Sequence, residues 1–568
     1  MRTRIRSFAA GLLALLALAV APVANAATSV WIGAGSSAQW QEYALATVND
    51  PALGATHHYT IKGKCSGVNC AQAFDSRKGA GGTVNDAQGG NIWITWNAAE
   101  TKIWAYLSVD SVVGNRLFFA TPRATLELST GVEATGSSMN LISPFLFAHG
   151  DSGKCGPGGA TESTCDASAL PANIYTALNN TPLSAALTDI RPEDALFASK
   201  RANCAGTPTL SCLGYGITGS PVGTPIASAF STSNAEPVSY AISGSDPVSG
   251  DAVPAYKTFP VGAQPIIIIT NRTDAAGLGQ AAIKNATHAE LQTIFSGANC
   301  SASQLGGTAH AIYPILREPL SGTMNTFEFT NMTSPTTLTG SQETGIGTHN
   351  PVDALACTAG GGARYRGIGT GEIVGGGSGG PASPGGVQNI ADSIGYVFFS
   401  YGNVSKLAGS ASYGYLTLDG VDPLTGQPGL VAGRLPLCST SSPITPCPET
   451  VPNSTFKNLR NGTYRSWSFL RAVTDASGKN LSNTENIVAA AQANINKYVP
   501  DFVPYIAAGG DAGMKYYRSH FTQSGVAGNN GLPFTEPSNE KGGDVGGCIE
   551  ATTTNVLNAH ENTSACSK

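Results

Sequence analysis

Arg317 and the segment Ser321-Gly322-Thr323 are the residues whose types and spacing could bind an anion. The apolar residues 311–316 predict a strand that ends at the arginine, and a helical pattern begins at the Ser-Gly-Thr segment. A helix start offers free backbone N–H groups and a partial positive charge, and a guanidinium matches the geometry of an oxyanion. This arrangement predicts a pocket for a small tetrahedral anion or a carboxylate. An ordinary N-cap beside a surface arginine would give the same pattern.

A second unit of the same kind lies near the start of the chain. The segment 29–35 predicts a strand that enters a glycine-rich turn, and Ser36 and Ser37 then begin a helix, with Gln39 in a capping-box position. An anion can be held between two facing helix starts. Ser36 and Ser37 are therefore candidate ligands from the opposite side of the pocket.

Asp189 is the candidate acceptor of a hydrogen bond. It follows a short predicted strand, residues 185–188, and the carboxyl ends of strands are where open α/β sheets bind ligands. A turn or helix-capping aspartate is the alternative interpretation.

The elements that position these residues predict an α/β fold with two lobes. We expect a long strand over 258–271 that crosses between the lobes, and a strand over 392–400 that returns to the first lobe. The other expected strands are 58–61, 91–96, 102–112, 116–121 and 416–418, and the expected helices are 174–178, 288–295 and 484–498.

The first 26 residues have the pattern of a secretory signal peptide. A basic start precedes an apolar run over residues 8–20, and Ala24-Asn25-Ala26 forms a cleavage site. No later apolar stretch is long enough to span a membrane. We therefore expect a periplasmic or extracellular protein that does not span the membrane.

Composition narrows the class of partner. Charged residues make up 12% of the chain and the net charge is -5, which argues against nucleic acid as a partner. Twelve cysteines fit an oxidising compartment, and their spacing does not suggest a metal site. We expect six disulfides, although the sequence alone leaves the connectivity open: Cys65–Cys70, Cys155–Cys165, Cys204–Cys212, Cys300–Cys357, Cys438–Cys447 and Cys548–Cys566.

The chain resembles the periplasmic phosphate-binding proteins of the phosphate ABC transporter, the PstS family, which have a type II periplasmic-binding-protein fold. The resemblance covers most of residues 29–475 and follows the order of the family. The similar segments are Gly33-Ala34-Gly35-Ser36-Ser37, Thr188-Asp189, Phe259 to Asn271, Leu291 to Gly297, Arg317 with Ser321-Gly322-Thr323, and Ser393 to Val397.

The resemblance implies that phosphate is held between two lobes for ABC-type uptake. Ser36, Ser37 and nearby amides would bind from one side, and Arg317 with Ser321-Gly322-Thr323 from the other. Asp189 would accept a hydrogen bond from the proton on the phosphate. It further implies a monomer, possible contact with an ABC permease, and no cofactor. The expected organisation is a signal peptide (1–26), a first lobe (27–262) with an insertion at about 65–172, a second lobe (263–393), a return to the first lobe (394–500) and a disulfide-stapled C-terminal extension (501–568).

Some features depart from the family. Pro319 stands where the family carries an acidic residue, Ala38 stands where it carries an aromatic one, and the extension has no counterpart. A secreted structural or surface-interaction protein that kept the fold and lost the ligand is therefore the alternative.

Enzymatic function is not expected. A motif similar to the one around a serine-protease nucleophile is found in His149-Gly150-Asp151-Ser152-Gly153, and His57 lies upstream of it. The residues that flank both positions do not match those of serine proteases. The segment 367–372 lacks the spacing of a nucleotide-binding loop, and we expect it to be a flexible turn.

Overall fold

The computed structural model describes most of the two lobes. The described residues are 28–61, 71–75, 86–128, 170–192, 195, 240–246, 249–317, 320–332, 355–367, 369–375, 386–437, 455–460, 463–464, 466–497, 501–504, 516–518 and 548–550. The expected signal peptide and most of the expected C-terminal extension lie outside them.

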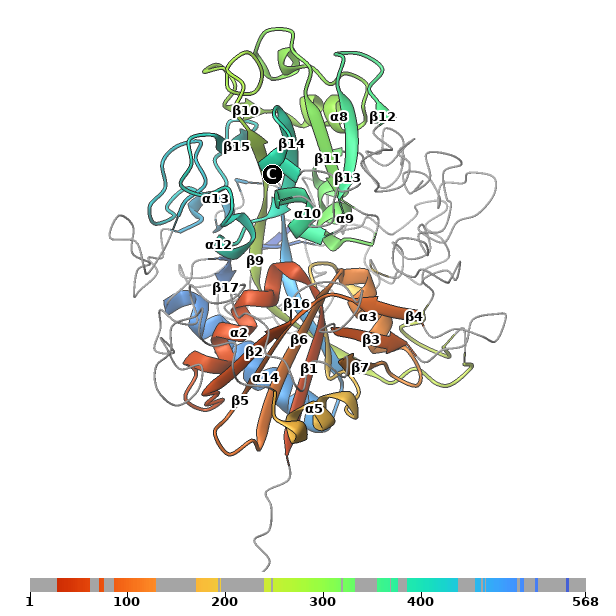
Figure 1. Ribbon diagram of the computed structural model, residues 1–568. Coiled ribbons are helices and arrows are strands. Elements are labelled where there is room, and N and C mark those ends of the chain that lie inside the picture. The colour runs from red at the N-terminus through yellow and green to blue at the C-terminus, as the bar shows by residue number, and fades with distance from the viewer. Residues whose placement is uncertain are drawn as a thin grey trace, which may run out of the picture.

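One mixed sheet runs through both lobes (Figure 1). Its strands lie in the order β12 (Leu355–Ala356), β13 (Ala363–Gly367), β11 (Tyr313–Arg317), β14 (Ser393–Phe398), β9 (Tyr256–Asn271), β16 (Trp467–Asp475), β8 (Ala185–Thr188), β1 (Ser29–Ser36), β6 (Lys102–Val109), β5 (Asn91–Trp96) and β2 (His57–Ile61). Three further strands attach to this path: β10 (Asn285–Ala286), β15 (Tyr413–Leu418) and β17 (Val503–Pro504).

The 16-residue strand β9 joins the lobes, as the sequence predicted. Its first part pairs with β16, and its second part pairs with β14 and β15. The run Ile266–Ile269 is fully buried, which explains why this segment is apolar without alternation. The first lobe contains the strands β16, β8, β1, β6, β5 and β2, and the second lobe contains β10, β11, β12, β13, β14 and β15. The strand β9 belongs to both lobes.

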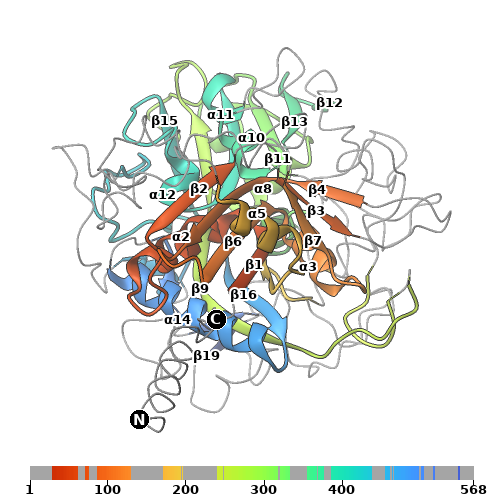
Figure 2. The same cartoon turned by 60° about the horizontal axis from the view of Figure 1, so that its bottom comes forward.

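Helices cover both faces of the sheet in the first lobe (Figure 2). Alternate residues of β1 point to opposite faces: Trp31 joins the hydrophobic cluster with α2 (Trp40–Asn49) and α14 (Lys479–Lys497), and Ile32 joins the cluster with α3 (Ser111–Phe119) and α5 (Ala172–Asn179). The first of these clusters continues through β9 into the second lobe. There it includes residues of α8 (His288–Phe295), α9 (Gly322–Phe327), α10 (Gly369–Gly375) and α11 (Gly386–Asn389). The predicted α/β class with two lobes and crossover strands is confirmed.

Two predicted lobe assignments are wrong. The strand β14 pairs with β11 and with the second part of β9, so residues 394–418 belong to the second lobe; the chain returns to the first lobe at β16. The range 65–172 is also not a single insertion, because β5 and β6 pair within the main sheet. A separate small sheet is formed by β4 (Asp86–Gly89), β3 (Ala71–Asp75) and β7 (Thr125–Leu128).

The strand predicted over 116–121 is wrong, because residues 111–119 form α3. The predicted strand over 102–112 correspondingly ends at Val109. All nine residues of α3 are buried. The segment therefore lacks the periodic spacing of apolar and polar residues by which a half-buried helix is distinguished from a half-buried strand in a sequence. This shift places Asp110 and Ser111 at a helix start.

The predicted disulfide Cys300–Cys357 is confirmed, with the two Cα atoms 5.9 Å apart. The other five predicted disulfides involve residues outside the described side chains. No described helix is both long enough and apolar enough to cross a bilayer.

Candidate functional site

The end of β1 brings Ser36 and Ser37 to the boundary between the lobes. Gly35 has φ of 143°, and a Cβ at this position would overlap the Leu187 carbonyl of β8, so the turn needs glycine. Ser36 accepts a hydrogen bond from the Ala38 amide (3.2 Å) and begins the 3-10 turn Ser37–Gln39, which leads into α2. The predicted capping box is wrong, because the side-chain oxygen of Gln39 accepts no hydrogen bond, while its side-chain nitrogen donates to backbone carbonyls of β8 and β16.

The end of β11 and the start of α9 provide the opposite side of the site. Arg317 is the last residue of β11, and its side chain is 2% exposed. Ser321 accepts a hydrogen bond from the Met324 amide (3.2 Å), as an N-cap does for α9. Gly322 lies so close to Asp189 that a Cβ at residue 322 would overlap the Asp189 carboxylate. The backbone at this helix start therefore approaches the opposite lobe directly.

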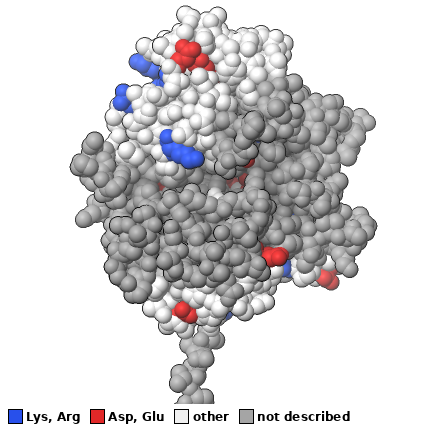
Figure 3. Space-filling model, viewed as in Figure 1, with Lys and Arg blue, Asp and Glu red and all other residues white. Residues whose placement is uncertain are grey.

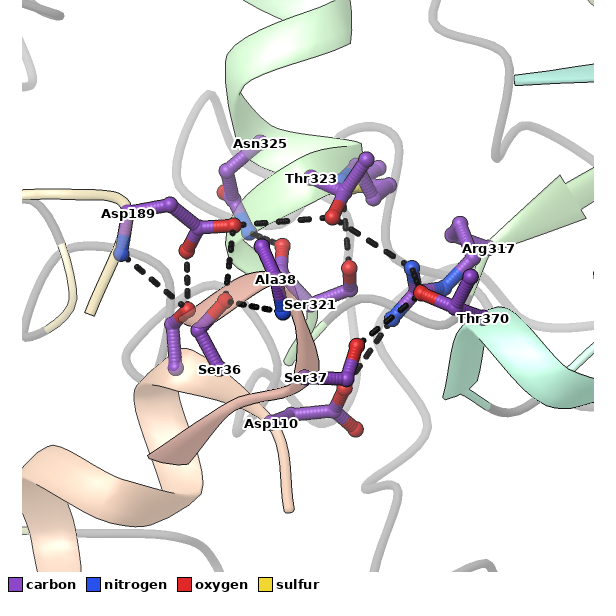
Figure 4. Close-up of polar contacts among 12 residues, drawn as sticks. Ser36, Ser37, Ala38, Asp110, Asp189, Arg317, Ser321, Thr323, Asn325 and Thr370 are labelled. Atoms are coloured by element: carbon purple, nitrogen blue, oxygen red, sulfur yellow. Dashed lines mark hydrogen bonds and ion pairs between the residues drawn. The ribbon is translucent and has the colours of Figure 1, made fainter. Parts of the chain in front are cut away.

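The carboxylate of Asp189 receives hydroxyl groups from both lobes (Figure 4). Its carboxylate accepts hydrogen bonds from Ser36 (3.4 Å), from Ser111, and from Thr323 of the second lobe (3.5 Å). Burial raises the pKa of Asp189, while hydrogen bonds from Ser111 and the backbone and the charge of Arg317 act to lower it. The carboxylate is thus positioned as a hydrogen-bond acceptor between the lobes.

Arg317 is held by residues from three other elements (Figure 4). Its Nη1 donates to Thr323 (3.3 Å) and to Thr370 of α10 (3.2 Å). Its Nη2 donates to Asp110 of the first lobe (3.1 Å). Thr370 also contacts Ser37, with the two hydroxyl oxygens 2.9 Å apart. The guanidinium and the hydroxyls of the two lobes therefore form one connected polar cluster.

The structure brings together all seven predicted site residues at the boundary of the lobes. Four of them (Arg317, Ser321, Gly322 and Thr323) come from the second lobe, and three (Ser36, Ser37 and Asp189) come from the first. A backbone hydrogen bond from Val112 to Leu320 (3.2 Å) also joins the lobes beside the site. Hydroxyls, a guanidinium and a helix start are donors suited to an oxyanion. Of the two buried carboxylates, Asp110 pairs with Arg317, whereas Asp189 can accept a hydrogen bond from a proton that a ligand carries.

Three site residues were missed from the sequence. Asp110 and Ser111 were placed inside a predicted strand, whereas an Asp-Ser pair directly after an apolar run is a recognisable helix start. Thr370 lies in the segment predicted to be a flexible turn, and that prediction is wrong. The strand β13 is parallel to β11 and is followed by α10, as β11 is followed by α9. Thr370, near the start of α10, therefore lies beside Arg317 at the end of β11.

The protease candidates do not form a described site. His57 lies on β2, where its ring stacks on Trp96 (5.6 Å between centroids) and contacts Thr56 (2.9 Å). Residues 149–153 lie outside the described residues.

A possible metal-ligand group lies at the other end of β11. Asp274, His310 and Asp392 place one ligand atom each within 4.8 Å of one another. His310 Nε2 is 3.0 Å from Asp392 and 3.3 Å from Asp274, so hydrogen bonding between the imidazole and the carboxylates explains this group without a metal.

Comparison with known proteins gives only weak similarity. No protein-family model matches the chain, and no curated protein matches its sequence. Among solved structures, an ABC-type phosphate transport receptor from Vibrio cholerae aligns at 13% identity with a TM-score of 0.24, over 45% of this chain and 78% of that one. PstS from Borrelia burgdorferi aligns at 14% identity with a TM-score of 0.24, over 42% and 70% of the two chains.

Proposed function

We propose that this protein is a solute-binding protein that holds a small oxyanion, phosphate, between its two lobes. The observation that carries the proposal is the convergence of Arg317, the start of α9 and the serines at the end of β1 on the boundary between the lobes. These groups come from separate segments of the chain, and a surface N-cap would not need them to meet. Asp110 is paired with Arg317, whereas Asp189 accepts hydrogen bonds from hydroxyls of both lobes and favours an anion that carries a proton.

Binding between lobes explains how such a site can admit and release its ligand. Arg317 and Ser321 are almost completely buried, so an anion reaches them when the lobes separate. The strand β9 pairs with strands of both lobes and would carry the hinge. Inside the closed site, donors that have already given up water would replace the hydration shell of the anion.

Uptake is the role that this site would serve in the cell. The secretory signal pattern and the resemblance to the phosphate transporter's binding protein support a periplasmic or extracellular location and delivery to an ABC permease. On the face in Figure 3, the described charged side chains lie as separate spots and not as one patch.

Isothermal titration with phosphate, arsenate and sulfate tests the proposal. Wild-type protein should bind phosphate and gain thermal stability with it. The variant Arg317→Ala should lose affinity by about 100-fold or more, because it removes a buried charged donor. Arg123→Ala is the matched control, since Arg123 pairs with Asp475 (2.6 Å) away from the site. Wild-type protein that shows neither heat nor a thermal shift with any of these anions would refute the proposed function.

The second candidate is a secreted structural protein that has this two-lobed fold, with the lobes held together, but binds no ligand between them. Within the described site, Asp189 receives hydroxyls from both lobes and Arg317 pairs with Asp110, so the lobes are complementary to each other. In that case the Arg317→Ala variant would lose thermal stability, whereas phosphate would not change the stability of the wild type.

A further inference from the structure

Two buried carboxyl groups, those of Glu42 and Asp501, face each other outside the proposed anion site. Both side chains are fully buried, and the two carboxyl groups lie within hydrogen-bonding reach of each other. In the part of the chain that the structure describes, no donor reaches either oxygen of Glu42 or the Oδ2 atom of Asp501. Two ionised carboxylates offer only acceptors, so the pair needs a proton to form a hydrogen bond.

The pair lies where the two lobes touch. Glu42 is in the first turn of α2, the first-lobe helix that follows the site serines. Asp501 precedes β17, which pairs with the lobe-crossing strand β9. The Oδ1 atom of Asp501 accepts a hydrogen bond from the amide of Tyr401 (2.8 Å), the first residue of α12 (Tyr401–Val404) in the second lobe. Asp501 is therefore bonded to the second lobe, while its partner Glu42 belongs to the first.

A further contact shows how closely α2 and α12 approach each other at this point. A Cβ at Gly402 of α12 would lie 2.1 Å from the side-chain oxygen of Gln41, which is next to Glu42 in α2. In Figure 1, both helices and β17 lie on the same side of the boundary between the lobes. A change in the interaction between Glu42 and Asp501 therefore acts directly on the contact between the lobes.

The ionisable neighbours of the pair, within the described residues, are tyrosines. Tyr43 of α2 and Tyr106 of β6 lie near Glu42, and Tyr401 lies near Asp501. Burial raises the pKa of each of these tyrosines, so all three remain neutral. The helix α14 packs against α2 and β17, and its described charged side chains are exposed: Lys479 and Glu485. None of these groups is a buried cation that would hold both carboxyls ionised.

The two carboxyls lose their protons at different pH. Burial and the neighbouring Asp501 raise the pKa of Glu42 well above its ordinary range, and burial raises the pKa of Asp501 to about 6. Glu42 therefore keeps its proton after Asp501 has ionised, and it can donate that proton in a charge-assisted hydrogen bond. Once Glu42 also ionises, two buried negative charges repel each other and the hydrogen bond is lost.

We propose that Glu42 and Asp501 form a proton-dependent clasp between the two lobes. A proton held between the carboxyls fastens α2 of the first lobe to the start of α12 in the second, and its release to solvent lets the lobes separate. The clasp is present while Glu42 is protonated, so it holds the lobes together at acid pH and loosens them at alkaline pH. It goes beyond the proposed function, because it acts whether or not a ligand binds between the lobes.

Small-angle scattering tests the clasp on the full-length protein, in buffers without phosphate or sulfate, from about pH 5 to about pH 9. The radius of gyration of the wild type should increase toward alkaline pH. Glu42→Gln provides a donor that cannot ionise, so this variant should stay compact over the whole range. Glu485→Gln is the matched control, since it makes the same change at an exposed residue of α14 and should follow the wild type.

Hydrogen exchange at the Tyr401 amide is the second measurement, because this amide donates to Asp501. At one alkaline pH, it should exchange about tenfold faster in the wild type than in Glu42→Gln, since the clasp is open only in the wild type. A radius of gyration that does not change with pH would overturn the proposal, and so would expansion of Glu42→Gln at the same pH as the wild type.

Should Glu42→Gln fail to fold, Asp501→Asn replaces it in both measurements. Its side-chain nitrogen can donate to Glu42, and its oxygen can still accept from Tyr401, so this variant should also stay compact at alkaline pH; expansion like that of the wild type would overturn the clasp. No oxyanion is added in these experiments, so their outcome does not depend on whether the protein binds phosphate.

Discussion

Replacing Gly322 with alanine should prevent the lobes from closing. A Cβ at residue 322 would overlap Asp189 Oδ1 and would lie 2.5 Å from both Asp189 Cγ and Ser111 Oγ, although Cβ contacts closer than 3.0 Å essentially do not occur. Asp189 and Ser111 belong to the first lobe, whereas Gly322 begins α9 in the second. The strain can therefore be relieved by moving the lobes apart.

The size of the effect follows from the contacts that would be lost. Overpacking of a buried position costs about 1–3 kcal/mol. Moving Asp189 away from α9 also breaks its hydrogen bond with Thr323, and a bond to a charged group contributes about 1.5–3 kcal/mol. A combined cost of about 3 kcal/mol on closure corresponds to a loss of roughly 100-fold in apparent affinity.

Calorimetric titration with phosphate measures this loss, and small-angle scattering with phosphate present reports whether the lobes still close. Gly371→Ala is the matched control. It also adds a methyl group to a glycine near the site, in α10 beside Thr370, but the new Cβ would meet nothing within 4 Å. Phosphate affinity that stays at the wild-type value in Gly322→Ala would refute the close approach between Asp189 and α9.

Two further predictions concern stability. Replacing both Cys300 and Cys357 with serine should lower the free energy of unfolding by about 4 kcal/mol, because the disulfide closes a loop with a sequence separation of 57; urea unfolding checks this, and an unchanged midpoint would contradict it. Burial raises the pKa of Asp501 from its ordinary value of 3.8 to about 6, and burial next to Asp501 also raises the pKa of Glu42. Since the folded protein holds the protons of both groups more tightly than the unfolded chain does, these groups stabilise the fold below about pH 4, and that stabilisation is lost as the pH rises through about 6. Asp501→Asn should flatten this part of the profile of unfolding free energy against pH. A profile of equal slope in the variant would contradict the assignment.

Much of the local structure could be predicted from the sequence, because it depends on neighbouring residues. The buried run of β9 and the apolar spacing of α8 set the type of each element, and both were predicted close to their observed bounds. The strand-to-helix turns that place Arg317 and Ser36 were likewise readable from residue type and order. These are short-range relations in which glycine, serine and the end of an apolar run have direct conformational meaning.

Strand order and the partners of buried charges depended on the tertiary structure. The sequence of β14 does not say whether it pairs beside β11 or returns to the first lobe, since a fully buried strand is apolar on both faces in either position. The uniform burial of α3 hid the helix start at Asp110, and the segment around Thr370 lacked a strong helical pattern.

The sequence by itself determined which turns could offer anion donors, because a helix start and its hydroxyls are encoded within a few residues. Only the tertiary structure decided that these turns face one another and that Asp110 neutralises Arg317 from the opposite lobe. The contact between Asp110 and Arg317 joins residues 207 positions apart in the chain, and it forms only when the strands of both lobes have paired with β9 in the folded protein.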